Sequence, residues 1–184
     1  MKSLSGEHTE FRQKLKKLDL GPIAYKLMHR EEGFGWTKAR TKQAIARYLM
    51  FLSLIYLYPN QPIVPTAEID QVWHQHILDT DKYAADCQML FGEFIHHFPY
   101  YGLRGICDRQ NRQQAFARTQ LLFQKHFATD ITKFTDELSK NIAKGQPCTL
   151  QGRASSGKRS ACILRRGKSR QERPHVKFSF DELV

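Results

Sequence analysis

Four of the eight histidines of this chain lie in one stretch, Asp70 to Gly102, which reads DQVWHQHILDTDKYAADCQMLFGEFIHHFPYYG. Imidazole and carboxylate groups together are typical ligands of Zn or Fe. The same groups can transfer protons in an acid–base site, ligate a haem iron, or form hydrogen bonds inside a protein core. The residue types therefore leave a metal or ligand site, a catalytic site and a set of structural histidines all open.

Helical spacing constrains how these side chains can meet. Residues 69–78 carry their apolar side chains at helical spacing, and Asp70 and His74 lie four residues apart on the same flank. His74 and His76 point about 160° apart on such a helix. These two histidines cannot bind one ion while the helix is unbroken, which argues against the simplest metal site.

A second helix is predicted from about Asp81 to about His97, with Tyr83, Cys87 and His97 on one face. Cys87 and His97 would then be roughly 15 Å apart along the helix. His97 could approach the first helix again only through a loose crossing of the two helices or through unwinding after Gly92.

The candidate metal ligands are His74, His76 and His97, with Zn or Fe as the metal. In this interpretation Asp70 orients His74 and contributes to ligand binding together with two aromatic residues, Trp73, which forms a wall of the pocket, and Tyr83. In the alternative interpretation, His76 and His97 are core residues and Asp70 with His74 is a pair at the rim of the domain.

The rest of the chain predicts an all-α fold, a single bundle-like helical domain. The strongest apolar run, Tyr48–Tyr58, is apolar on every side, which places its helix at the centre of the bundle. Thr37 and Thr66 are predicted N-caps, and Pro59 ends the central helix. The helices are expected over residues 8–18, from Pro22 onward, and over 37–59, 67–78, 81–97, 109–127 and 129–145.

The formal net charge of +11 is concentrated near the C-terminus. Residues 151–184 carry nine basic and three acidic residues, whereas residues 1–150 carry 20 and 15. We therefore predict a helical domain over 1–150 and a disordered basic tail over 151–184. Such a tail could contact a nucleic acid or an acidic protein partner.

Several features predict a cytoplasmic protein. The four cysteines are scattered without a close pair, which is typical of a reducing compartment. No secretory signal is visible, and the apolar run of 11 residues is shorter than the roughly 20 residues that a transmembrane helix needs.

The stretches EIDQVWHQHILDTDKYAADCQMLFG and HHFPYYG resemble the glycine-rich-domain-containing-protein-like family, in the cyanobacterial form that lacks the glycine-rich region. The shared positions are Asp70, Trp73, His74, His76, Tyr83, Cys87 and His97. The resemblance favours a joint role for the histidines and implies no particular activity. It predicts a ligand- or metal-binding module, with a non-catalytic protein-interaction module as the alternative, and leaves open whether the protein is an enzyme.

Overall fold

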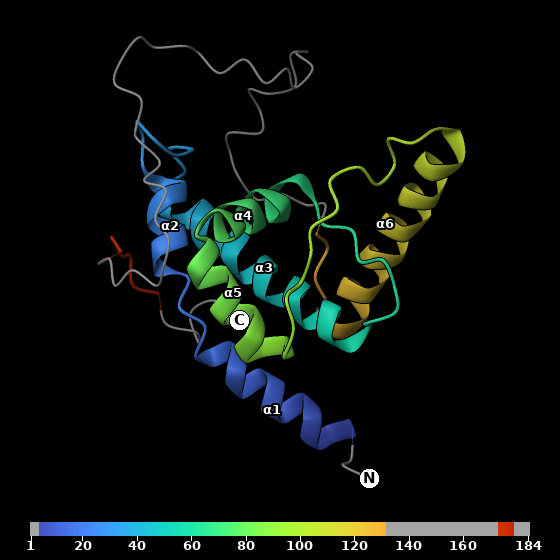
Figure 1. Ribbon diagram of the computed structural model, residues 1–184, viewed down its shortest axis with the longest axis horizontal. Helices are drawn as coiled ribbons and strands as arrows, with labels where there is room; N and C mark the ends of the chain where they lie inside the picture. The colour runs from blue at the N-terminus through green and yellow to red at the C-terminus, as the bar shows by residue number, and fades with distance from the viewer. Residues whose placement is uncertain (1–3, 132–172, 179–184) are drawn as a thin grey trace. The chain divides into compact units, whose positions relative to one another are not determined.

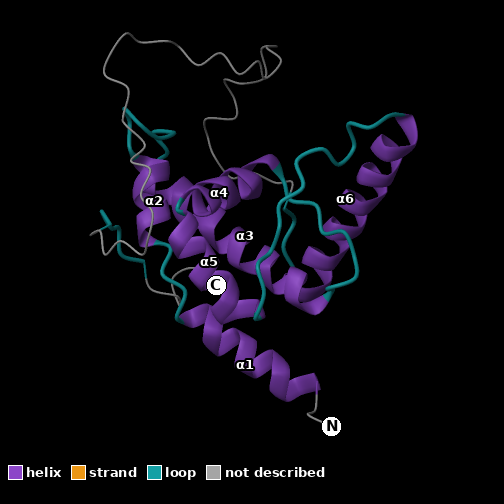
Figure 2. Ribbon diagram, viewed as in Figure 1, coloured by secondary structure: helices purple, strands orange, loops and turns teal. Residues whose placement is uncertain are grey.

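The computed structural model describes residues 4–131 and 173–178, and within these ranges all regular structure is helical (Figure 2). The elements are α1 (Leu4–Lys16), α2 (Gly21–Met28), α3 (Lys38–Leu57), α4 (Ala67–Leu78), α5 (Thr80–Phe91) and α6 (Ile106–Phe127) (Figure 1). The all-α class predicted from the sequence is confirmed. The described residues belong to one compact unit. Most of the predicted helix 129–145 and most of the basic tail lie outside them.

Helix α3 is the central element, as its apolar composition predicts. It packs against α1, α2, α4 and α6, and Tyr48, Phe51 and Leu54 are completely buried. The burial of such large side chains is the main stabilising contribution to the fold. None of the helices in the described part of the chain is long and apolar enough to cross a membrane.

The start of α4 is fixed by a helix cap and by a partly buried ion pair. Thr66 Oγ1 accepts a hydrogen bond from the backbone N–H of Ile69 at 3.3 Å, which confirms the predicted cap. In the same first turn, Glu68 lies 3.3 Å from the guanidinium of Arg47 and 3.4 Å from that of Arg40, both on α3. Burial raises the pKa of Glu68 even though both arginines oppose this shift. These contacts hold the first turn of α4 against α3.

Helix α5 ends earlier than the sequence predicts. The apolar spacing predicts a helix to about His97, but α5 stops at Phe91 and Gly92 follows with φ = 78°. Glycine adopts this left-handed conformation without the steric penalty of a Cβ atom. The chain after Gly92 is not helical, so residues 94–98 leave the axis of α5. This unwinding is the condition under which His97 can return to α4.

We expect Gly92→Ala to lower the free energy of unfolding by about 1 kcal/mol, because the left-handed conformation is strained for alanine. No atom lies within 4 Å of a Cβ built at this position, so steric overlap adds nothing. Urea denaturation followed by circular dichroism measures the change. Gly92→Asn serves as the control, since asparagine tolerates this conformation better and should show a smaller loss. Equal stability of Gly92→Ala and the natural protein would contradict this account of the end of α5.

The described part of the C-terminal region, residues 173–178, lies against the helical domain. The Arg173 guanidinium donates two hydrogen bonds to the Asp79 carboxylate, at 2.6 and 2.8 Å. The Val176 N–H donates to the Gly21 carbonyl at 3.2 Å, and Phe178 packs on the core. Arg173, a basic residue of the predicted tail, is thus paired with an acidic residue of this chain.

Candidate metal centre

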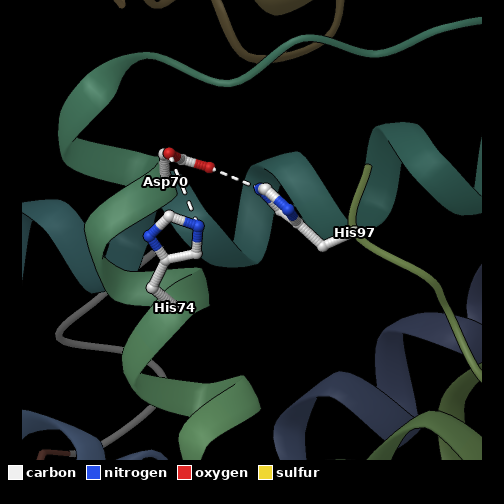
Figure 3. A group of neighbouring side chains, drawn as sticks. All are labelled: Asp70, His74 and His97. Carbon is white, nitrogen blue, oxygen red and sulfur yellow. Dashed lines mark hydrogen bonds and ion pairs between the residues drawn. The ribbon is translucent and has the colours of Figure 1, made fainter. Parts of the chain in front are cut away.

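Asp70, His74 and His97 come together on one side of α4 (Figure 3). The distance from His97 Nε2 to Asp70 Oδ1 is 3.0 Å, and that from His74 Nε2 to Asp70 Oδ2 is 3.8 Å. One ligand atom from each of the three residues lies within 4.8 Å of the others. We call these three residues the Asp70 cluster. It contains the donor set of two imidazoles and one carboxylate that Zn and Fe accept.

Two members of the cluster are placed by helix geometry alone. Asp70 and His74 are separated by one turn of α4, so their side chains lie on the same face. Asp70 also lies in the first turn, where the helix dipole stabilises a carboxylate. The side chains of Asp70 and His74 are 32% and 47% exposed, which leaves the cluster accessible from solvent.

His97 reaches the cluster because its segment is held against α4. The Tyr83 hydroxyl donates a hydrogen bond to the Ile95 carbonyl at 2.6 Å and accepts one from the Trp73 indole N–H at 2.9 Å. The Trp73 ring meets the His97 ring edge to face, with 4.6 Å between their centroids. Burial raises the pKa of Tyr83, so its hydroxyl stays protonated and keeps the donated bond. Tyr83, for which ligand binding stays a prediction, contacts Trp73 and the chain before His97 through its hydroxyl.

His76, expected among the metal ligands, lies outside the Asp70 cluster. It is buried on the opposite side of α4, where Nδ1 is 3.0 Å from the Tyr48 hydroxyl and Nε2 is 2.9 Å from Asp86 Oδ2. Lys82 donates to the same Asp86 oxygen at 2.8 Å. Both ring nitrogens of His76 are thus engaged in a buried network. The unbroken helix keeps His74 and His76 apart, as their spacing requires.

Beside the cluster lies an open pocket of about 580 Å³. Asp70, Trp73 and His97 border it together with the extended segment 62–65 and the segment 96–101. Arg112 of α6 completes the wall. Sequence reasoning singled out neither His96 nor Arg112, which both line this pocket. In the sequence Arg112 is an ordinary polar position of a predicted amphipathic helix, and no local pattern connects it with α4.

Comparison with known proteins relates the chain to one family. The family model described as UCP032817-like matches residues 26–137, a range that contains the Asp70 cluster. Over 96 residues the chain is 29% identical to the Arabidopsis thaliana protein named "Glycine-rich domain-containing protein 1". That match covers 50% of this chain and 12% of the plant protein. No solved structure matches the chain.

Proposed function

The chain belongs to the UCP032817-like family, and we propose that its helical domain binds one divalent transition metal ion through Asp70, His74 and His97. The observation that supports this proposal most strongly is the position of His97. This residue lies 27 positions after Asp70, yet its Nε2 atom is 3.0 Å from the Asp70 carboxylate, and His74 flanks the same carboxylate.

The distances suit an ion of the size of Zn²⁺ or Fe²⁺. Ligand atoms about 2.0–2.1 Å from a tetrahedral ion are about 3.4 Å from each other. His97 Nε2 lies 3.0 Å from Asp70 Oδ1 and His74 Nε2 lies 3.8 Å from Asp70 Oδ2, and one ligand atom of each residue lies within 4.8 Å of the others, so modest side-chain rotation brings three ligand atoms to this spacing. The half-exposed His74 side chain can rotate to bring its nitrogen closer. One carboxylate and two neutral imidazoles leave a positive charge on a bound divalent ion.

A structural hydrogen bond alone does not explain why two imidazole rings pack together beside Asp70. One hydrogen bond from His97 would be enough to tie the 94–98 segment to Asp70. The ring of His74 nevertheless lies 4.7 Å from the ring of His97, centroid to centroid. Protonation of both rings would produce repulsion between them, whereas a shared ion uses both as neutral ligands. With three protein ligands, the ion keeps positions for water or a bound molecule.

The test uses the full chain, purified without a histidine tag. Zn²⁺ affinity is measured by isothermal titration calorimetry against a competing chelator, and bound metals by elemental mass spectrometry. We expect His74→Ala to weaken Zn²⁺ binding more than about 100-fold, since loss of an outer-shell partner alone costs 10–100-fold. His96→Ala is the matched control, because His96 is an exposed neighbour of His97 outside the cluster. Absence of uptake, or equal loss in both variants, would contradict the proposal.

A further inference from the structure

The pocket beside the Asp70 cluster combines a charged side chain with an apolar surface. Its lining includes three prolines, Pro62, Pro65 and Pro99, together with the ring of Trp73. The Arg112 side chain borders the same pocket as Asp70 and His97. A volume of about 580 Å³ lies within the range of small-molecule sites. A ligand that fills it would be largely apolar with one charged group.

Arg112 is held at this wall by the turn before α6. Gly102 has φ = 90°, and a Cβ built on it would lie 2.4 Å from Arg112 Cδ. The stem of Arg112 therefore lies directly against Gly102, and a side chain at this position would be strained and would displace the stem. The Asp108 carboxylate fixes this turn, because it accepts hydrogen bonds from the backbone N–H groups of Gly102, at 2.7 Å, and Arg104, at 3.1 Å.

Arg104 and Arg112 differ in their electrostatic partners. The Arg104 guanidinium donates to both oxygens of Asp108, at 2.8 and 3.2 Å, and this hydrogen bonding is the first cause that holds the pKa of Asp108 at about 2. Arg112 forms no hydrogen bond or ion pair with any residue in the described ranges. Its planar guanidinium is thus available to an anion, and a carboxylate is the group that it binds in a two-pronged geometry.

We propose that this pocket binds a small monocarboxylic acid with an aromatic or branched aliphatic body, as the ligand of the metal centre. The carboxylate binds the ion held by the Asp70 cluster, and Arg112 supplies a second positive charge. The apolar body lies against Trp73 and the prolines. This inference rests on the proposed function, because without the ion the carboxylate would face Asp70, a group of like charge.

The experiment uses the full chain loaded with Co²⁺, whose visible absorption bands report a change of metal ligand. Phenylacetate is titrated in, and phenylacetamide, a neutral molecule of nearly the same shape, is the control ligand. We expect phenylacetate to shift the cobalt bands and to bind at least 10-fold more tightly than the amide. Arg112→Ala and Gly102→Ala should each weaken phenylacetate binding about 10-fold or more. Both should leave Co²⁺ uptake unchanged.

Arg118→Ala is the matched variant, because Arg118 is exposed on the same helix and does not line the pocket. We expect its phenylacetate affinity to equal that of the natural protein. Equal binding of acid and amide, or an unchanged affinity in Arg112→Ala, would overturn the carboxylate inference and leave the metal centre standing. A protein that takes up no Co²⁺ would overturn the metal centre and this inference with it.

Discussion

The variant His76→Ala is expected to lose about 3 kcal/mol of unfolding free energy, because it combines a large-to-small core substitution with a broken hydrogen-bond network. His76 is 1% exposed, and its ring nitrogens contact the Tyr48 hydroxyl and the Asp86 carboxylate. Tyr48 is itself fully buried, so its hydroxyl would be left without the partner that it has now. Chemical denaturation followed by circular dichroism measures the loss.

His74→Ala is the control for this prediction, since it removes a histidine two residues away on the exposed side of α4. In metal-free buffer we expect its stability to change by less than about 0.5 kcal/mol, as for most surface substitutions. The His76→Ala protein, measured at a temperature where it remains folded, should still bind Zn²⁺ with the affinity of the natural protein. A stable His76→Ala protein that has lost the metal would show instead that His76 is a ligand.

Local signals made most of the helices predictable. Thr37 and Thr66 cap α3 and α4 as expected, because a cap depends on residues three positions apart and on nothing else in the fold. The burial of Tyr48 could likewise be predicted from the uniformly apolar composition of its helix. The start of α5 was harder to predict: the sequence indicates a helix from about Asp81, whereas the helix begins at Thr80 and its N-cap, Asp79, forms no side-chain capping hydrogen bond.

The end of α5 shows where periodicity misleads. Phe94 and His97 continue the apolar spacing of the helix, and so the pattern extends it beyond Gly92. The Ile95 carbonyl lies in the non-helical segment after Gly92, where it accepts a hydrogen bond from the Tyr83 hydroxyl at 2.6 Å. This tertiary hydrogen bond gives one backbone group of the non-helical segment a partner. A pattern of side-chain types within one segment carries no information about it.

The Asp70 cluster likewise has a part that local sequence predicts and a part that depends on tertiary contacts. The pairing of Asp70 with His74 follows from four-residue spacing and could be predicted. The position of His97 beside Asp70 depends on Gly92 and Tyr83. The sequence alone could therefore predict only that the chain must unwind after Gly92, or the helices cross loosely, for His97 to reach α4. Arg112 enters the pocket from α6 because Gly102 admits its stem, a relation between two side chains that no motif expresses.

The same dependence on His97 predicts how metal should affect stability. Asp70 and His74 belong to α4, whereas His97 belongs to a non-helical segment 27 residues after Asp70. An ion bound to all three residues ties that segment to α4 and binds the folded state alone. At a Zn²⁺ concentration 100 times the dissociation constant, the free energy of unfolding should rise by about 2.7 kcal/mol. For a chain of this size the melting temperature should rise by roughly 5–10 °C.

In His97→Ala we expect this Zn²⁺-dependent rise in melting temperature to disappear, because two ligands from a single helix no longer link separate parts of the fold. The apo variant should lose only about 1 kcal/mol, the contribution of the hydrogen bond between His97 and Asp70. Differential scanning calorimetry with and without Zn²⁺ provides the measurement, and Mg²⁺, which prefers oxygen ligands, provides the control ion. A rise that persists in His97→Ala would place the Zn²⁺ elsewhere on the protein. A rise that is lost in His97→Ala but kept in His96→Ala would instead locate the ion at the Asp70 cluster.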